Sequence, residues 1–460
     1  MLPKKIIITG ASGFVGTSLV PKVQQAGYEL LLAGRDPVDI SRRFKGATTT
    51  DYEGLGAATK GFDAVLHLAA RNNDQDGDLE AFRAGNVGVM QDVIAACRVG
   101  GVTRFINFTT LHAEKAGNTT PYGQSKLEAE QCPEAAEGLH VTHIRLPAVY
   151  GTQYKGKLAV LNKVPGVLRK PAFWLLAALK PTVHIDRVYE AVTQQMAQEG
   201  AAHVLVTDEQ RGNPVYWLFQ KVVDLSFAIV IVGLLWWLLL FFWIMIARKS
   251  DGPSLFAQQR VGLHGRVFTC WKFRTMQQGT KQAGTHEMGA ATLVPMGGFL
   301  RKTKIDELPQ VWNILKQEVS LVGPRPCLPV QVELVEKRKT ANVLSVPVGI
   351  TGWAQIHEID MSDPDRLVQW DDEYVKLRSI LLDLKIILRT ARGSGQGDRT
   401  QVGERRLPDW DILWLINLIQ RPRAASRWRP ISLVSCHRLL QRTLPFRFCS
   451  DTWERKNLVC

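Results

Sequence analysis

Cysteine is scarce in this sequence, and no two cysteines form a recognisable pair. The seven cysteines in 460 residues are odd in number, widely spaced and include no Cys-x-x-Cys motif. This pattern argues against a disulfide framework and against a zinc site, and it fits a reducing compartment. The apolar run at residues 6–8 leads directly into a glycine turn and is too short for a signal peptide. We therefore expect the chain to begin in the cytoplasm.

Internal repeats and long low-complexity tracts are also missing, which excludes a solenoid and a largely disordered chain. A chain of 460 residues exceeds one ordinary core and predicts two domains with additions. The formal net charge of +14 suits nucleic acid, anionic lipid or phosphorylated substrates. Because the basic segments carry no nucleic-acid-binding motif with interleaved aromatic residues, we expect no nucleic-acid partner.

One long hydrophobic run divides the chain. Residues 227–247 contain no charge and approach the ~20 residues that a helix needs to cross a bilayer. The run is apolar on all faces and is closed by Arg248 and Lys249, which favours membrane insertion over a buried core helix. We expect a front domain over residues 1–212, a linker and membrane helix over 213–250, a second domain over 251–392, and a basic tail without an assignable fold over 393–460.

The front segment has the pattern of an α/β fold. Short β-branched or aliphatic runs alternate with helical patterns, which is typical of a parallel sheet. Strands are predicted at residues 5–9, 30–33, 64–68, 104–108 and 141–145.

A glycine-rich turn follows the first predicted strand. Gly10, Gly13 and Gly16 have the spacing Gly-x-x-Gly-x-x-Gly and lead into an amphipathic helix. Such glycines let backbone N–H groups approach a pyrophosphate at a helix N-terminus, where the helix dipole favours an anion. Glycine spacing alone is a weak signal, because turns use glycine freely.

A tyrosine and a lysine four residues apart strengthen that signal. Tyr122 and Lys126 share one helical face, and a nearby ammonium favours the phenolate form of tyrosine, which suits acid–base work on a sugar hydroxyl. Thr110 follows a predicted strand in front of this helix and is placed to hydrogen-bond the same oxygen. Alone, such a pair is more often an ordinary exposed helix face.

Together with segments 67–70 and 145–151 and with Asn86, this pattern resembles the extended short-chain dehydrogenase/reductase family, the nucleotide-sugar epimerases and reductases. The resemblance covers residues 4–205. It implies a Rossmann-type fold, an NAD or NADP cofactor, and Thr110, Tyr122 and Lys126 as the catalytic residues. The cofactor-binding residues that we expect are Gly10, Gly13, Phe14, Gly16, Arg35, Ala69 and Lys126.

The front segment departs from this family in three places. Leu111 and His112 follow Thr110 where the family's dehydratases carry an Asp-Glu pair, which disfavours dehydration. Arg35 ends the second predicted strand and suits a ribose 2′-phosphate, which favours NADP. The substrate-binding lobe is shortened, and its residues 167–176 are basic, then aromatic and aliphatic. We favour a core helix for these residues; the alternative is a face that rests on the membrane interface.

The second domain combines two adjacent carboxylates with many cations. Asp306 and Glu307 could place one carboxylate on a phosphorus atom and the other on a hard cation such as Mg²⁺. Arginine forks and lysine charges suit phosphate oxygens. The cations that we expect to bind substrate phosphates are Arg260, Lys272, Arg274, Arg301 and Arg325. Taken alone, an Asp-Glu pair before Leu-Pro is more often a solvated helix start.

Five motifs in order, between residues 221 and 389, closely resemble the monotopic phosphoglycosyl transferases, the bacterial sugar transferases that act on undecaprenyl phosphate. This resemblance implies a small α-rich domain in which Asp306 is the nucleophile and Glu307 assists through Mg²⁺. It also implies that Lys272, Arg301 and Arg325 bind phosphates. The expected partners are a UDP-sugar, undecaprenyl phosphate and the lipid of the bacterial inner membrane, with both domains on the cytoplasmic face and a homodimer left open.

The hydrophobic run departs from this second family. Its members break the membrane helix with Ser-Pro so that it re-enters the cytoplasmic face, whereas here residues 235–238 contain no proline to kink a helix. Because both domains need cytoplasmic substrates, we still expect a re-entrant helix. We expect a bifunctional enzyme whose front domain reduces or epimerises the sugar at C4. The alternatives are a front domain that only senses nucleotide-sugars, and a membrane-tethered scaffold.

Overall fold

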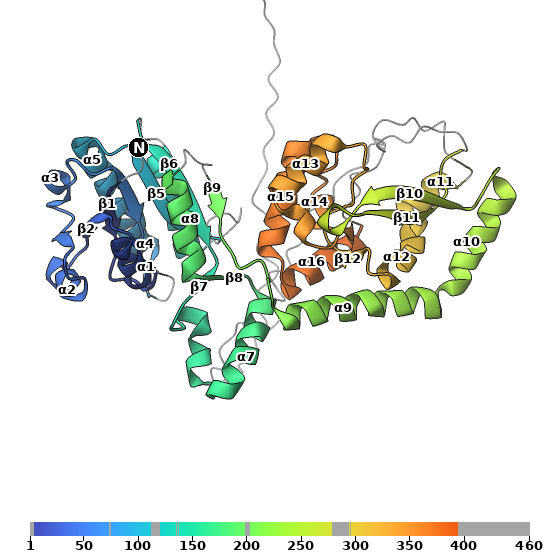
Figure 1. Ribbon diagram of the computed structural model, residues 1–460, viewed down its shortest axis with the longest axis horizontal. Coiled ribbons are helices and arrows are strands. Elements are labelled where there is room, and N and C mark those ends of the chain that lie inside the picture. The colour runs from blue at the N-terminus through green and yellow to red at the C-terminus, as the bar shows by residue number, and fades with distance from the viewer. Residues whose placement is uncertain are drawn as a thin grey trace, which may run out of the picture. The chain divides into compact units, whose positions relative to one another are not determined.

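The computed structural model describes residues 4–72, 75–111, 120–134, 136, 138–197, 203–277, 294 and 296–393 (Figure 1). His112 and residues 394–460 of the predicted basic tail lie outside these ranges.

The front of the chain forms a parallel sheet with the strand order β3-β2-β1-β4-β5-β6-β9, in which every neighbouring pair is parallel. The strands are β1 (Lys5–Thr9), β2 (Glu29–Ala33), β3 (Thr48–Thr50), β4 (Ala64–His67), β5 (Arg104–Thr110), β6 (His140–Leu146) and β9 (His203–Leu205). The predicted α/β class is confirmed. A two-stranded parallel sheet adds β7 (Ala148–Tyr150) and β8 (Thr182–His184).

Helices cover both faces of the main sheet, because consecutive strand residues point to opposite sides. Ile6 and Ile8 pack in one core with residues of α1 (Phe14–Gln25) and α8 (Ile185–Ala197), whereas Ile7 packs in a second core with residues of α5 (Val89–Gly100) and α6 (Pro121–Glu134). The smaller front helices are α2 (Pro37–Arg43), α3 (Leu55–Ala58) and α4 (Leu79–Arg83). A run of buried aliphatic residues in each central strand therefore supports two layers of helices.

One further front helix does not join either core. In α7 (Gly166–Leu179) only Ala177 and Ala178 are buried; Val167, Leu168 and Leu175 are exposed, and the other large apolar side chains are half-buried. The prediction of a core helix over residues 167–176 is therefore wrong. The apolar composition was identified correctly, but the shortened lobe offers no second layer to cover it.

The hydrophobic run of residues 227–247 spans the end of one helix and most of a second one. Helix α9 (Pro214–Ile229) continues through a π-helical turn (Val230–Leu234), and α10 (Trp236–Lys249) follows a sharp change of direction (Figure 1). Leu235 has non-helical dihedrals (φ −109°, ψ 13°), and its N–H donates to the carbonyl oxygens of Val230 and Ile231. Gly233 weakens helix propensity in this turn, and a π-type bond accounts for the kink without proline.

Among the described residues, one helix, Pro214–Leu234, is long and apolar enough to cross a membrane, and only 17% of its apolar window is buried. That exposure separates it from an ordinary core helix.

The second domain packs on these two helices. Ala228 and Ile231 pack with Val311 and Ile314, while Phe242 of α10 packs with Phe273. Two-stranded sheets pair β10 (Leu255–Val261) with β11 (Val267–Phe273) and β12 (Ser320–Val322) with β13 (Gly349–Thr351). The helices are α11 (Gly297–Thr303), α12 (Val311–Leu315), α13 (Val332–Thr340), α14 (Trp353–Ile356), α15 (Pro364–Leu377) and α16 (Ile380–Ala391). The predicted small α-rich domain is confirmed.

Candidate functional sites

The glycine turn after β1 is closely packed against neighbouring backbone. Gly10 adopts φ +73°, and a Cβ at this position would lie 2.6 Å from the backbone nitrogen of Ala69. At Gly16 a Cβ would meet the carbonyl oxygens of Gly10 and Ala11 at 2.6 Å. Gly13 precedes α1 as its N-cap, and its N–H donates to the carbonyl of Gly10 at 3.0 Å. Only glycine can be accommodated at positions 10 and 16 without a steric clash. The turn leads directly into the N-terminus of α1.

The other predicted cofactor residues border this turn. Phe14 begins α1, and the ammonium of Lys155 lies over its ring, 5.5 Å from the ring centroid. Ala69 follows β4, and its N–H donates to the hydroxyl of Thr9 at 3.4 Å. Arg35 is exposed just after β2, whereas the neighbouring Asp36 caps α2 by accepting from the N–H of Asp39. Both side chains at the end of β2 are exposed, and the acidic one is engaged in capping.

Lys126 is buried on α6, and burial lowers its pKa to about 8. Burial, reinforced by the nearby charge of Lys126, lowers the pKa of His67 to about 3, so this histidine is neutral at pH 7. Tyr122 is half-buried one turn before Lys126 and packs edge-to-face on Phe82. Their burial rules out an ordinary solvated helix face for this pair.

A hydrogen-bond network fixes the same helix. Asn86 donates to the hydroxyl of Ser125 at 2.9 Å and accepts from the N–H of Arg71 at 2.8 Å. The hydroxyl of Ser125 donates in turn to the carbonyl of Tyr122 at 3.0 Å. Thr110 ends β5, the strand before this helix. The network holds the first turn of α6 against the segment that follows β4.

In the second domain, the adjacent carboxylates lie in a short 3₁₀ segment (Ile305–Gln310) that follows α11. Lys304 connects α11 to this 3₁₀ segment. It has a left-handed conformation (φ 56°), which turns the chain sharply before Asp306. Both carboxylate residues are buried, with 9% of Asp306 and 8% of Glu307 exposed. They are therefore not a solvated helix start.

The two carboxyl groups have different electrostatic surroundings. Lys272 and Arg325 donate to the same oxygen of Glu307, at 2.9 and 3.2 Å. Burial opposes ionisation of Glu307, but these two cations and Lys304 outweigh it and lower its pKa. Burial and the charge of Glu307 raise the pKa of Asp306 to about 6, against the opposing pull of Lys272, Arg301 and Arg325. Glu307 is the anchored anion, and within the described ranges no hydrogen bond engages the carboxylate of Asp306.

The five predicted phosphate-binding cations divide into two groups. The charges of Lys272, Arg301 and Arg325 all act on Asp306. Arg260 instead donates to Gln258 and to the carbonyl of Pro326. Arg274 is buried and donates to the carbonyl oxygens of Ser250 and Gly252, at the end of α10. One amino group of Arg274 is thus engaged in anchoring the chain after α10.

Two cations near this site were not singled out from the sequence. Lys304 lowers the pKa of Glu307, and its place two residues before the carboxylate pair was the available signal. Arg338 is fully buried and donates to the carbonyl of Arg325 at 2.8 Å. Its position within the charged run of α13 is typical of a solvated helix face, so the sequence offered no signal for its burial.

A divalent cation would meet two carboxylates at this site. Among the described residues there is no cluster of three or more metal-ligating side chains. Mg²⁺ is commonly held by one or two carboxylates together with substrate phosphates and water. The donor set of Asp306 and Glu307 fits that mode of binding.

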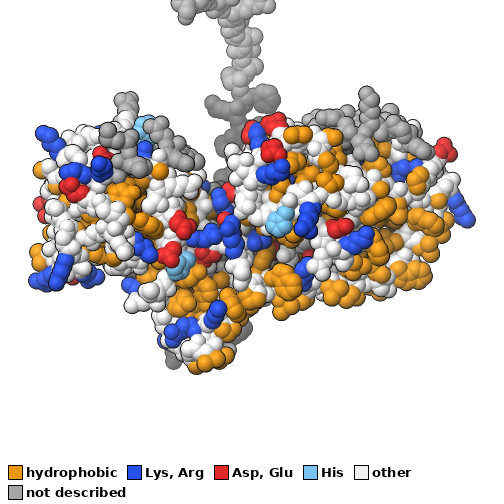
Figure 2. Space-filling model, in the orientation of Figure 1, with side chains coloured by type: hydrophobic (Ala, Val, Ile, Leu, Met, Phe, Trp, Pro, Cys, Tyr) orange, Lys and Arg blue, Asp and Glu red, His pale blue; other side chains and the backbone are white. Residues whose placement is uncertain are grey.

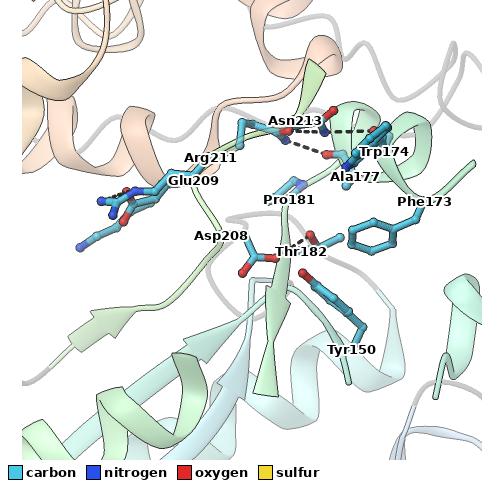
Figure 3. Close-up of a pocket in the computed structure, with 12 residues that line it drawn as sticks. Tyr150, Phe173, Trp174, Ala177, Pro181, Thr182, Asp208, Glu209, Arg211 and Asn213 are labelled. Carbon is cyan, nitrogen blue, oxygen red and sulfur yellow. Dashed lines mark hydrogen bonds and ion pairs between the residues drawn. The ribbon is translucent and has the colours of Figure 1, made fainter. Parts of the chain in front are cut away.

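A separate pocket of about 150 Å³ lies beside α7 and contains none of the residues predicted for either site (Figure 3). Tyr150, Thr182 and Asp208 line one side, where the Thr182 hydroxyl donates to Asp208 at 3.1 Å. Ligand pockets generally measure about 300–1,000 Å³, so this one is too small to enclose a nucleotide-sugar.

Two known families account for most of the described chain. Residues 6–174 match the NAD dependent epimerase/dehydratase family, and residues 215–396 match the bacterial sugar transferase family. Each match contains one of the two sites described above.

Curated relatives align with the second half of the chain. The chain is 38% identical over 175 residues to "Uncharacterized sugar transferase EpsL" of Bacillus subtilis, covering 38% of this chain and 86% of the relative. It is 32% identical over 219 residues to the UDP-N-acetylgalactosamine-undecaprenyl-phosphate N-acetylgalactosaminephosphotransferase of Aeromonas hydrophila, covering 46% of this chain and 52% of the relative. For the undecaprenyl-phosphate galactose phosphotransferase of Salmonella typhimurium the identity is 32% over 190 residues, covering 38% of this chain and 40% of the relative. The chain spans about half or less of the last two relatives.

Solved structures align with the front of the chain. The UDP-N-acetylglucosamine 4-epimerase of Bacillus cereus aligns with TM-score 0.35 and 18% identity, covering 45% of this chain and 78% of the epimerase. WbmG of Bordetella bronchiseptica, solved with NAD, aligns with TM-score 0.37 and 23% identity, covering 48% and 78%.

The matches and the two sites define the class: an enzyme with an NAD-dependent epimerase-type segment in front of a sugar transferase. Through its second half, the chain belongs to the bacterial sugar transferase family.

Proposed function

We propose that this enzyme transfers a sugar-1-phosphate from a UDP-sugar to undecaprenyl phosphate and thereby initiates assembly of a cell-surface polysaccharide. The observation that carries the proposal is the buried carboxylate pair, in which Lys272 and Arg325 hold Glu307 while Asp306 lies beside them. The printed names of the Aeromonas and Salmonella relatives supply the substrate class.

The transfer proceeds in two balanced steps. A carboxylate oxygen of Asp306 attacks the phosphorus that carries the sugar, the bond from that phosphorus to the bridging oxygen breaks, and UMP leaves. An oxygen of undecaprenyl phosphate then attacks the same phosphorus, which forms the lipid diphosphate sugar and releases the carboxylate. Both steps place negative charge among Lys272, Arg301 and Arg325, half-buried cations that stabilise this charge.

Mg²⁺ held by Asp306 and Glu307 would supply further neutralisation of the diphosphate. The low pKa of Glu307 keeps that side chain anionic, as a cation ligand requires. Arg301 donates to the hydroxyl of Thr275 at 3.0 Å through Nε, which fixes the direction of its guanidinium.

For the front domain we propose NAD(P)-dependent reduction or epimerisation of the sugar at C4. A bound nicotinamide would supply hydride exchange, and the crowded glycine turn fits the approach of its pyrophosphate. Tyr122 moves the proton of the sugar hydroxyl, Lys126 supports the phenolate form, and Thr110 hydrogen-bonds the same oxygen. The exposed Arg35 favours NADP.

We further propose that residues 213–250 form the membrane segment between a front domain (1–212) and the transferase domain (251–392). The kink at Leu235 supports a re-entrant helix, so that both domains face the cytoplasm at the inner membrane. Cysteines introduced at Val215 and Leu255 in a variant without native cysteines should react with an impermeant reagent from the same side. Reaction from opposite sides would establish a spanning helix.

The transfer step is tested with radiolabelled UDP-sugar and undecaprenyl phosphate. Asp306→Asn should abolish lipid-linked product and the covalent sugar-phosphate adduct, while Asp365→Asn should leave both unchanged. Asp365 is a matched control because its side chain is 73% exposed and pairs with Lys337. A folded Asp306→Asn protein with full activity would disprove the proposed mechanism, and absence of transfer by the unaltered enzyme would leave the scaffold alternative.

The front domain is tested separately by analysing the sugar on the lipid product. Tyr122→Phe should leave the transfer rate unchanged but abolish conversion of the sugar. If the product sugar is the same with and without the Tyr122 hydroxyl, the front domain acts as a nucleotide-sugar sensor.

A further inference from the structure

Helix α7 presents an apolar face that no described part of the chain covers. Val167 is 89% exposed, Leu168 57% and Leu175 50%. With Pro171 and the half-buried Trp174, they fall within about one third of the helix circumference, as the spacing of 3.6 residues per turn requires. This is the pattern of a helix that lies on an apolar surface.

Basic side chains flank this face. Arg169 and Lys170 are exposed, and the ammonium of Lys170 lies 5.1 Å from the ring centroid of Trp174. Similar Lys–Trp contacts join Lys221 to the exposed Trp217 on α9 and Lys316 to the exposed Trp312 at the end of α12. Tryptophan concentrates at membrane interfaces, and lysine is attracted to anionic lipid headgroups.

Hydrogen bonds fix α7 to the start of the candidate membrane helix (Figure 3). Asn213 caps α9 by accepting from the N–H groups of Val215 and Tyr216, and its amide also donates to the carbonyl of Trp174 at 3.0 Å. Gln210 donates to the carbonyl of Ala177 at 2.6 Å. A lipid surface that holds the first turn of α9 therefore holds α7 as well.

Exposed apolar residues continue from one helix to the other. Trp217 and Leu218 in the first turns of α9 are 59% and 58% exposed. Figure 2 shows hydrophobic side chains over α7 and along α9 and α10, with lysines and arginines between them. The surface is thus continuous with the segment proposed to enter the membrane.

We propose that α7 is a second membrane-contacting helix, whose face from Val167 to Leu175 lies in the headgroup region of an anionic bilayer and holds the front domain against it. The proposal rests on the proposed membrane location of α9. Its occupant is lipid rather than a second copy of the chain, because each apolar patch carries a lysine suited to anionic headgroups.

The full-length chain in nanodiscs of phosphatidylethanolamine and phosphatidylglycerol provides the test. A photo-crosslinking phenylalanine derivative is placed at Val167, at Ile229 of α9, or at Val99, which is 75% exposed on α5. Irradiation at positions 167 and 229 should give covalent lipid adducts, detected by mass spectrometry, several-fold more abundant than at position 99.

Any other pattern of crosslinks would contradict one of the two membrane contacts. Lipid adducts at 229 but not at 167, or a crosslink from 167 to another copy of the chain, would overturn the role of α7 and leave the membrane location of α9 intact. Absence of adducts at 229 would overturn the membrane location itself, and the inference with it.

A paired substitution provides an independent measurement. V167Q/L168Q should increase hydrogen–deuterium exchange of residues 166–179 in anionic nanodiscs, whereas V38Q/V99Q, at similarly exposed apolar positions, should not. Equal exchange of this segment in both variants and the parent chain would contradict lipid contact by α7.

Discussion

Arg338 and Asp371 form a buried ion pair, with 2.6 Å between Nη2 and Oδ2 and with 0% and 2% of the two side chains exposed. Arg338 also donates to the carbonyl of Arg325, and the Arg325 guanidinium contacts Glu307. The buried pair therefore holds the backbone of Arg325, whose guanidinium is one of the two cations bound to Glu307.

Breaking this pair should be costly. Arg338→Met leaves Asp371 buried without its cation, and we expect a loss of about 3–5 kcal/mol of unfolding free energy, measured by denaturation in detergent. A double substitution that also changes Asp371 to Leu should recover most of that stability, because no buried charge remains. Equal instability of the single and double variants would show that packing, not the ion pair, dominates.

Lys272 should affect catalysis more than stability. Lys272→Met removes one of two charged hydrogen bonds to Glu307, which we expect to cost about 1–3 kcal/mol in stability and about 10²–10³-fold in transfer rate. Adding Glu307→Gln should restore stability without restoring the transfer rate. Recovery of activity in the double variant would contradict a catalytic role for Glu307.

Gly10 and Gly27 allow the effect of backbone strain to be measured separately from the effect of a steric clash. Gly10 and Gly27 have φ +73° and +85°, but a Cβ at Gly27 would meet nothing within 4 Å. Alanine at either position should cost about 1–2 kcal/mol through left-handed strain. Only Gly10→Ala should also abolish NAD(P)H binding, measured by nicotinamide fluorescence. Similar binding in both variants would place the pyrophosphate elsewhere.

Arg35 should discriminate between the two nicotinamide cofactors. Arg35→Ala should weaken NADPH binding by about tenfold, corresponding to one charged contact with the 2′-phosphate, and leave NADH affinity unchanged. Fluorescence titrations with both cofactors provide the measurement. A parent enzyme that prefers NADH would refute the expected NADP preference.

Asp383 should make stability depend on pH. Burial raises its pKa to about 7, although the hydroxyls of Tyr216 and Tyr374 donate to the carboxylate at 2.7 and 3.1 Å. Between about pH 4 and 7 the folded chain keeps a proton that the unfolded chain has released, so stability falls as pH rises, by on the order of 1 kcal/mol per pH unit. Above about pH 7 the folded and unfolded chains both carry the ionised carboxylate, and stability no longer changes with the titration of Asp383.

The substitution Asp383→Asn provides the check, because an amide imitates the protonated carboxyl group and does not titrate. This variant should unfold with a flatter pH profile over the same range in detergent. An unchanged slope would assign the dependence to another group.

The local order of the chain was determined by the sequence itself. The alternation of strands and helices in the front domain, the glycine turn and the adjacent carboxylates all depend on neighbouring residues, whose periodicity and backbone freedom are visible in a linear pattern. For that reason β1 occupies the predicted residues 5–9, and the glycine turn follows it directly.

Only the tertiary structure decided which side chains meet and which are covered. It paired Lys272 and Arg325 with Glu307, engaged Arg274 at the end of α10, and buried Arg338 although the charge pattern of its helix is typical of a solvated one. It also broke the hydrophobic run at Leu235 without proline and left α7 uncovered. Burial and ion pairing depend on segments far apart in sequence, so no local pattern of charge or hydrophobicity could determine them.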